Sequence, residues 1–245
     1  MEVVPAIDLR GGRCVRLYQG DYSRETLYSG DPVAVALRWV EEGATRLHVV
    51  DLDGARAGVP ANLDAVAKIA AAAGVPIQLG GGIRTLESAK AVADRGVDRV
   101  ILGTAALETP DLVKEVCGML GSGRVIVSVD AKDGYVVVRG WEQASRTTAL
   151  SLAKRVAGWG VLRIMYTDVS RDGTLTEPNF EGVQQLVDGS GLAAMAAGGI
   201  SSIGHLKRLA LLGAEAAIVG KALYTGGVDL RSAIRETGAI SAKRV

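Results

Sequence analysis

Residues 78–107, QLGGGIRTLESAKAVADRGVDRVILGTAAL, return in altered form as residues 196–223, AAGGISSIGHLKRLALLGAEAAIVGKAL. Each copy has an apolar strand that ends in glycines, an amphipathic helix, a glycine stop, a second strand and a second glycine turn. Six aligned pairs share one spacing of 117 positions: Gly82 with Gly199, Ile83 with Ile200, Leu86 with Ile203, Gly96 with Gly213, Gly103 with Gly220, and Ala105 with Ala222. The repeat predicts a chain made of two similar halves.

Short apolar runs alternate with longer amphipathic runs along the whole chain. The predicted strands are residues 3–8, 47–51, 77–79, 100–103, 125–130, 164–168, 193–197 and 216–219. The predicted helices are residues 32–42, 62–73, 86–95, 111–120, 148–159, 180–187, 203–212 and 230–236. Strict alternation of this kind predicts an α/β fold, namely a single (β/α)8 barrel of the TIM-barrel type.

The spacing of the repeat also holds outside the quoted stretches. It relates Gly43 to Gly160, Arg46 to Arg163, and Asp51 to Asp168. We therefore predict one domain over residues 1–245, composed of half-barrels at approximately 1–122 and 123–245. Corresponding sites of the two halves would lie on opposite sides of the barrel mouth, where the loops after the strands build active sites.

The composition limits the class of partner. The chain has 245 residues, 48% of them hydrophobic, and its 28 Lys and Arg residues nearly balance 27 Asp and Glu residues. Such a chain has no basic field to recruit nucleic acid or an anionic membrane. The cysteines, Cys14 and Cys117, show no metal-ligand spacing, and no apolar run suggests a signal peptide or a membrane span. We expect a cytoplasmic, monomeric protein that binds a small molecule.

The paired glycine turns suggest two phosphate sites. Glycine lets backbone N–H groups approach a phosphate closely at the positive end of the following helix. Glycines also occur at such turns for steric reasons alone, but their recurrence in pairs favours phosphate binding. The predicted phosphate-binding residues are Gly81, Gly82, Gly103 and Thr104 for one phosphate, and Gly198, Gly199, Gly220 and Lys221 for the other, with Gly173 as a further contact. A ligand that touches both sites would carry a phosphate at each end.

Two predicted strands end in a carboxylate, at Asp8 and Asp130. Strands 1 and 5 face each other across a barrel, so this pair suits a general acid and a general base on opposite sides of one substrate. Each Asp could instead cap a turn, but the symmetric placement favours catalysis. Thr167 has a hydroxyl suited to holding a substrate group, or is only a β-branched strand residue. The pattern does not separate the roles of Asp51, Asp168, Asp53 and Asp172.

The long segments 9–30 and 131–147 stand out among short connections and are predicted to be lids or binding loops. They carry Arg16, Arg139 and Trp141, side chains that can grip and stack on a planar heterocycle. Trp141 could equally anchor its own loop by packing. Arg84, which follows the first glycine turn, is predicted to be a further substrate contact.

Other chemistries find little support in the sequence. His48 and His205 are far apart, and no HExxH, CxxC, GxSxG or GxxxxGK[ST] motif is present. We therefore expect no metal and no cofactor, and an acid–base reaction remains.

Several segments together resemble a known enzyme family over essentially the whole chain. They are VPAIDLRGGRCVRLYQGDY, HVVDLDGA, QLGGGIR, LGTAALETP, VSVDAKDG, RGW, TDVSRDGTLTEPN, AAGGISS and AIVGKALY. They resemble the phosphoribosyl-formimino-AICAR-phosphate (ProFAR) isomerases of histidine biosynthesis. The resemblance implies a (β/α)8 barrel of two half-barrels and a substrate with a phosphate at each end.

The resemblance also implies a reaction and roles. The reaction is an Amadori rearrangement of an aminoaldose to an aminoketose, catalysed by an intramolecular oxidoreductase. By this resemblance Asp8 matches the proton acceptor and Asp130 the proton donor. Thr167 matches an active-site threonine, and Asp172 matches an aspartate that could compete for the acid role.

Three alternatives stay open at this point. The sister cyclase of the same pathway shares the barrel and both aspartates, but usually begins with a CLDV-like strand where this chain has PAIDL. A bifunctional form that also isomerises phosphoribosyl anthranilate shares the RGW motif, so Arg139 and Trp141 leave this alternative open. The third alternative is a phosphosugar-binding protein without turnover.

Overall fold

The computed structural model describes residues 1–242 and contains a closed barrel of parallel strands. Its strands, in order around the ring, are β1 (Glu2–Arg10), β4 (Leu47–Asp51), β5 (Ile77–Gly80), β6 (Arg99–Leu102), β7 (Val125–Lys132), β10 (Arg163–Asp168), β11 (Ala193–Ala197) and β12 (Ala216–Val219). Pairing of β12 with β1 closes the ring. The predicted (β/α)8 barrel is confirmed, and β1 faces β7 across it as expected.

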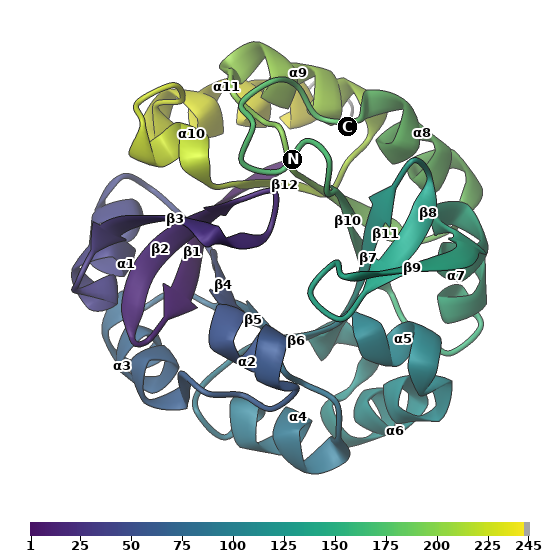
Figure 1. Ribbon diagram of the computed structural model, residues 1–245. Helices are drawn as coiled ribbons and strands as arrows, with labels where there is room; N and C mark the ends of the chain where they lie inside the picture. Colours follow the sequence, from purple (N-terminus) through teal and green to yellow (C-terminus); the bar gives the residue numbers. More distant parts are fainter. Residues whose placement is uncertain (243–245) are drawn as a thin grey trace.

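A ring of helices covers the outside of the barrel (Figure 1). These helices are α1 (Pro32–Glu41), α3 (Leu63–Ala73), α4 (Leu86–Ala93), α6 (Pro110–Leu120), α7 (Ala149–Ala157), α8 (Phe180–Gly189), α9 (Ile203–Leu212) and α11 (Leu230–Ala242), with a 3-10 turn η1 (Ser122–Arg124) before β7. Each begins and ends within a few residues of its predicted range, except that α11 continues to Ala242. The apolar stripes of the helices pack against the outer faces of the strands, which forms the larger hydrophobic core.

A second, smaller core fills the inside of the barrel. It consists of side chains from alternate strand positions: Val4, Ala6, Ile101, Ile126, Met165, Met195, Ala216 and Ile218. Because strand side chains alternate between the two faces of the sheet, the next inward positions towards the carboxyl ends of the strands lie above this layer. Asp8 follows Ala6 in this way, and Asp130 follows Ser128. The packed interior is therefore the floor on which the site stands.

The two long segments contain β-hairpins, which corrects the prediction that they are loops. They form β2 (Arg13–Tyr18) with β3 (Asp21–Ser29), and β8 (Tyr135–Val138) with β9 (Gln143–Thr148). β2 returns antiparallel to β1, and β8 returns antiparallel to β7. In Figure 1 both hairpins extend over the barrel mouth from opposite sides.

Tight turns of two residues join β1 to β2, β2 to β3 and β7 to β8. The turns are Gly11–Gly12, Gln19–Gly20 and Asp133–Gly134, and every residue in them has a positive φ, between 51° and 81°. Two consecutive positive φ values are the mark of a type I′ turn, whose twist matches that of antiparallel strands. The Gly-Gly and Asp-Gly pairs were a sequence signal for hairpins at these points.

Three short helices at the carboxyl ends of strands also escaped prediction. They are α2 (Leu52–Ala57), α5 (Thr104–Glu108) and α10 (Lys221–Tyr224). Gly103, predicted as the end of a strand, is instead the N-cap of α5, and Gly220 is the N-cap of α10. The two glycines have nearly the same backbone angles, φ −100° and ψ −90° against φ −104° and ψ −105°. The repeat seen in the sequence is thus matched in the backbone. Within residues 1–242 no helix is long and apolar enough to cross a membrane.

Candidate active site

A deep cavity opens at the carboxyl ends of the barrel strands, between the two hairpins. It spans about 1570 Å³, including the part of the mouth that is open to solvent. Residues predicted from the sequence as site residues line it: Asp8, Arg16, Gly81, Gly82, Arg84, Gly103, Thr104, Asp130, Arg139, Trp141, Thr167, Asp172, Gly173, Gly198, Gly199, Gly220 and Lys221. The fold therefore brings all of them to one cavity, which is large enough for an elongated ligand.

Asp8, near the end of β1, is buried and paired with Arg16 of β2. Arg16 Nη1 lies 2.8 Å from Asp8 Oδ2, and Arg16 Nη2 lies 3.9 Å from Asp172 Oδ1. Burial raises the pKa of Asp8 to about 6, against the lowering effect of Arg16 and with a further increase from Asp172. Burial opposes the charge of Arg16, but Asp8 and Asp172 raise its pKa above the ordinary value. This cluster leaves Asp8 able to exchange a proton near neutral pH.

Asp130, on β7, lies opposite Asp8 and is held by hydrogen bonds to both carboxylate oxygens. The Ser128 hydroxyl donates to Oδ1 at 2.7 Å, and the Trp141 indole N–H donates to Oδ2 at 2.9 Å. Burial raises the pKa of Asp130, while hydrogen bonds from Trp141, Ser128 and Thr167 lower it and Asp172 raises it further. Thr167 lies beside Asp130 in the register of β10 on β7, which explains its contact with the carboxylate.

Asp172 lies on the loop after β10 and shares Arg16 with Asp8. Burial raises the pKa of Asp172, whereas Arg16, the Gly173 backbone N–H and Lys221 lower it. Its loop follows β10, the neighbour of β7, and its charge acts on both Asp8 and Asp130. Asp172 therefore lies close enough to influence both of the other carboxyl groups.

The two hairpins meet over the cavity at Gly20 and Trp141. A Cβ atom on Gly20 would lie 2.5 Å from Trp141 Cε3, so only glycine allows the indole ring to pack flat on this turn. Trp141 itself has a φ of +72°, which is rare for a bulky residue. The indole thus packs against the first hairpin and donates to Asp130, which agrees with an anchoring role, while its stacking on a substrate heterocycle stays a prediction.

The glycine pairs after β5 and β11 have steric reasons to be glycine. Gly81 and Gly82 have φ of +112° and +77°, and Gly198 and Gly199 have φ of +85° and +75°. A Cβ on Gly81 would overlap the Asp51 carbonyl oxygen, and one on Gly199 would overlap the Glu177 carbonyl oxygen. Close packing of the turns alone therefore accounts for these glycines, whatever ligand they contact.

Gly103 and Gly220 differ from those pairs. A Cβ on Gly103 would make only an ordinary contact of 3.8 Å with Ser128, so no described residue requires glycine there. A Cβ on Gly220 would overlap the guanidinium of Arg16. The space beside Gly103 is open to the cavity, which allows a ligand to approach its backbone closely.

Polar groups surround both ends of the cavity. At the Gly103 end, the Arg139 backbone N–H donates to the Thr104 hydroxyl at 3.0 Å, while the Arg139 side chain pairs with Glu108 at 2.8 Å. At the other end, the Lys221 ammonium donates to the Gly173 carbonyl oxygen at 2.9 Å. The guanidinium of Arg84 donates to the Ala55 carbonyl oxygen at 3.1 Å. Lys221 and Arg16 are thus cations close to the Gly220 turn, whereas Arg139 is engaged by Glu108.

Asp51 and Asp168 are structural, which separates them from the other acidic residues. Asp51 accepts hydrogen bonds from the Gly54, Ala61 and Asn62 backbone N–H groups and from the Asn62 side chain. Asp168 accepts from the Ser170 backbone N–H and hydroxyl, and from Asn179 at 2.8 Å. Neither aspartate lines the cavity. Asp53 likewise accepts from Gly11 and Asn62 and fastens the first hairpin.

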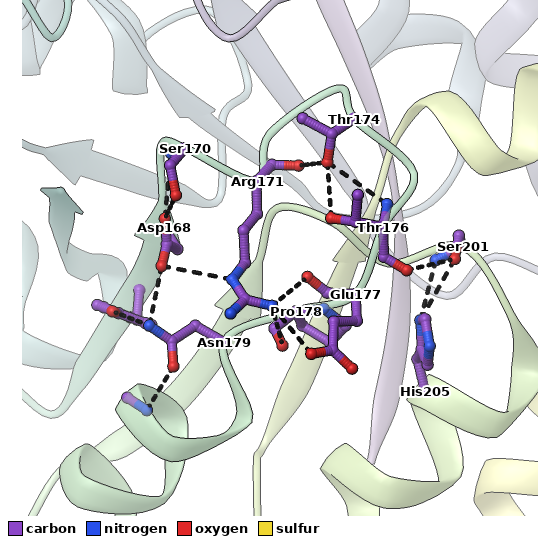
Figure 2. Close-up of polar contacts among 12 residues, drawn as sticks. Asp168, Ser170, Arg171, Thr174, Thr176, Glu177, Pro178, Asn179, Ser201 and His205 are labelled. Carbon is purple, nitrogen blue, oxygen red and sulfur yellow. Dashed lines mark hydrogen bonds and ion pairs between the residues drawn. The ribbon is translucent and has the colours of Figure 1, made fainter. Parts of the chain in front are cut away.

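The loop after β10 is fixed by a network that runs outward from Asp168 (Figure 2). Arg171 lies 3.7 Å from Asp168 and donates to the Glu177 and Pro178 carbonyl oxygens. Figure 2 also shows Ser201, which donates to Thr176 and contacts His205 at the start of α9. The network holds the segment that carries Asp172 and Gly173 over the cavity.

Sequence reasoning missed Ser128 and the buried pair of His48 and Gln78. Ser128 could have been found from its position two residues before Asp130, since both then point into the barrel. Within residues 1–242, no group of three or more His, Cys, Asp or Glu residues could hold a metal ion. The chemistry that the described residues offer is proton transfer between these carboxyl groups and a molecule bound in the cavity.

The fold and site define a barrel with carboxyl groups between two glycine-rich ends of one cavity. Residues 2–229 match the family described as "Histidine biosynthesis protein". The chain belongs to this family. It is 51% identical over 236 residues, 96% of this chain and 99% of the relative, to the 1-(5-phosphoribosyl)-5-((5-phosphoribosylamino)methylideneamino) imidazole-4-carboxamide isomerase of Dehalococcoides mccartyi. Enzymes of the same name from Picosynechococcus sp. and Roseiflexus castenholzii are 52% identical over 241 residues and 50% identical over 234 residues. These matches cover 97% and 96% of this chain, and 94% and 98% of the relatives.

Proposed function

We propose that this chain is a cofactor-independent isomerase that converts ProFAR, an aminoaldose, to PRFAR, the corresponding aminoketose, in histidine biosynthesis. The observation that carries the proposal is the placement of two carboxyl groups, the buried Asp8 and the partly buried Asp130, on opposite strands of one cavity. Relatives of about 50% identity carry the name of this isomerase. An Amadori rearrangement needs one acid and one base on opposite sides of the sugar, and this pair supplies both.

The first step assigns the acid to Asp130. Burial raises the pKa of its carboxyl group, which favours the protonated form that a general acid needs. Protonation of the ribose ring oxygen by Asp130 opens the ring and gives a Schiff base. Asp172 is the competing acid, but the charges of Arg16 and Lys221 favour its carboxylate form, whereas the pKa of Asp130 is lowered by neutral hydrogen-bond donors alone. We assign Asp130 as the main acid for this reason.

The second step assigns the base to Asp8. The Arg16 guanidinium at 2.8 Å favours the carboxylate, and burial keeps the pKa at about 6, so the group is a carboxylate at neutral pH and still basic. Asp8 removes the proton from C2 of the Schiff base. The resulting enolamine becomes the ketose when C1 gains a proton and the 2-hydroxyl loses its proton. Thr167 holds a substrate oxygen beside Asp130.

The ends of the substrate would be held by the two glycine-rich turns. Gly81, Gly82, Gly103 and Thr104 would bind one phosphate, and Gly173, Gly198, Gly199, Gly220 and Lys221 would bind the other. The open space at Gly103 and the ammonium of Lys221 support this assignment. Arg16, Arg84, Arg139 and Trp141 would contact the substrate between the phosphates. A ligand fixed at both ends places its reacting ribose between Asp8 and Asp130.

The oligomeric state and the compartment belong to the same proposal. We infer a cytoplasmic monomer that binds a small bisphosphate and neither nucleic acid nor membrane. Both cysteines are free and buried, as suits a reducing compartment, and the charges nearly balance. Analytical ultracentrifugation at assay concentrations tests the monomer, because a dimer would sediment at twice the mass.

The experiment that tests the function is an assay of the purified protein with ProFAR and phosphoribosyl anthranilate side by side. We expect turnover of ProFAR to PRFAR without added metal or cofactor. Turnover of both substrates would make the enzyme bifunctional. Ammonia-dependent turnover would indicate the cyclase, and tight binding of ProFAR without turnover would indicate a binding protein. Activity on neither substrate would overturn the proposal.

A further inference from the structure

A buried polar pair, His48 and Gln78, interrupts the apolar interior of the barrel. His48 of β4 lines the floor of the cavity beside Ala6 and Ile101, and Gln78 of β5 is fully buried behind it. Gln78 Nε2 lies 3.0 Å from His48 Nδ1. The register aligns Ala6 with His48, so His48 lies one inward position below the level of Asp8. The pair is therefore directly beneath the reacting groups.

The hydrogen bond fixes where the imidazole carries its proton. An amide nitrogen only donates, so His48 Nδ1 accepts and the proton of the neutral ring is on Nε2. Burial, followed by the charge of Arg16, lowers the pKa of His48 to about 3, so the ring is neutral at physiological pH.

Both residues have polar atoms without a partner in the described chain. Gln78 Oε1 is buried and has no hydrogen-bond partner within residues 1–242. His48 lines the cavity, and its ring has no hydrogen bond there besides the one that Nδ1 makes to Gln78, which leaves Nε2 without a partner. A half-satisfied polar pair is less stable in a core than an apolar pair of the same size. Stability alone therefore does not explain the pair.

We propose that His48 donates its Nε2–H to an oxygen of the reacting ribose, and that Gln78 is a positioning residue that keeps the proton on Nε2. The floor around His48 is formed by Ala6, Ile101, Met165 and Ile218, none of which can hydrogen-bond through its side chain. Asp8 above it is an acceptor in its role as base, and the Ser128 hydroxyl is already engaged by Asp130, so the Nε2–H of His48 is the donor left for a sugar oxygen at this floor. This inference rests on the proposed isomerase function.

The position of the proton can be measured without turnover. The chain has only two histidines, His48 and His205, so ¹⁵N-histidine labelling gives two rings, and the His205→Gln variant assigns the remaining signals to His48. We expect a protonated Nε2 and an unprotonated Nδ1 from pH 5 to pH 8. In Gln78→Glu, whose carboxylate only accepts, we expect Nδ1 of His48 to become protonated. A protonated Nδ1 in the parent, or an unprotonated Nδ1 in Gln78→Glu, would overturn the role of Gln78.

Kinetics on ProFAR test the contact of His48 with substrate. We expect His48→Leu to lower kcat/KM about tenfold or more, the cost of a lost hydrogen bond near the reacting atoms. The double variant His48→Leu/Gln78→Met should show the same loss while its Tm stays equal to or above that of the parent, because it replaces polar groups by apolar ones. Met195→Leu, in the same interior core, controls for altered packing and should keep the parent kcat/KM.

The outcomes separate this inference from the proposed function. Parent turnover together with parent-like kcat/KM in His48→Leu would overturn the inference and leave the isomerase function intact. A parent without turnover would overturn both. A double variant whose Tm and kcat/KM both fall would assign the pair a structural role, which also contradicts the inference.

Discussion

The guanidinium of Arg16 lies 2.8 Å from the carboxylate of Asp8, and its second terminal nitrogen lies 3.9 Å from the carboxylate of Asp172. One buried cation therefore lies near two carboxyl groups, the buried Asp8 and the partly buried Asp172. The contact depends on β2 returning antiparallel along β1, which aligns Val15 with Asp8 and brings the next residue, Arg16, over the mouth. The first hairpin is thus part of the site and not only a cover.

The raised pKa of Asp8 predicts a pH dependence of stability. The folded-state pKa of about 6 exceeds the usual aspartate value of 3.8, so the protonated carboxyl stabilises the fold, fully so below pH 4. That contribution is lost as pH rises through 6, by about 1 kcal/mol between pH 5 and pH 7. Urea denaturation at both pH values should show this loss in the parent and not in Asp8→Asn. An equal pH dependence of stability in the two proteins would contradict a folded-state pKa of about 6 for Asp8.

The open space at Gly103 predicts a change in binding without a loss of fold. In Gly103→Ala the new methyl group contacts Ser128 only at 3.8 Å, so we expect stability within about 1 kcal/mol of the parent. The methyl group would keep a phosphate from the backbone, and KM for ProFAR should rise about tenfold. Steady-state kinetics with urea denaturation measure both quantities.

Gly199→Ala is the contrasting variant, because Gly199 has a φ of +75° and a Cβ there would overlap the Glu177 carbonyl oxygen. We expect it to lower the free energy of unfolding by more than about 2 kcal/mol. If Gly103→Ala kept the KM of the parent for ProFAR, close approach of a phosphate to the Gly103 backbone would be refuted.

The contact between the hairpins predicts an effect of Gly20→Ala. Its Cβ would lie 2.5 Å from Trp141 Cε3, so the indole must move away from Asp130, with a change in tryptophan fluorescence and a kcat/KM lowered about tenfold. Gly12→Ala is the matched control, because its φ of +72° is close to the +74° of Gly20 and nothing lies within 4 Å of its Cβ. Both variants should lose about 1 kcal/mol of stability. Equal kinetics in the two variants would show that the contact is without consequence.

The barrel was predictable because its signals are local. Apolar runs such as residues 125–130 and the glycines that end helices mark each unit, and the alternation of units then leaves one architecture. The hairpins carried a local signal too, in Gly11–Gly12 and Asp133–Gly134. A segment with few apolar residues, such as β3 with the sequence DYSRETLYS, nevertheless gives no strand pattern of its own.

The site was predictable only in part, for a physical reason. Asp8 and Asp130 follow from their position at the ends of strands, whereas the partner of each depends on register and on side chains distant in sequence. Arg16 meets Asp8 through the hairpin, and Trp141 meets Asp130 from a loop with positive φ values. The structural role of Asp51 and Asp168 had a signal, since Asn62 and Asn179 share the spacing of the repeat.

The kcat of Asp8→Asn and of Asp130→Asn on ProFAR tests the central claim, that these two residues are the base and the acid. Each variant keeps the size of the side chain and removes its ability to exchange a proton. We expect each kcat to fall about 100-fold or more, as is typical when a general acid or base is lost. Circular dichroism and the Tm establish that the fold is intact. A kcat within about tenfold of the parent in both folded variants would contradict the account.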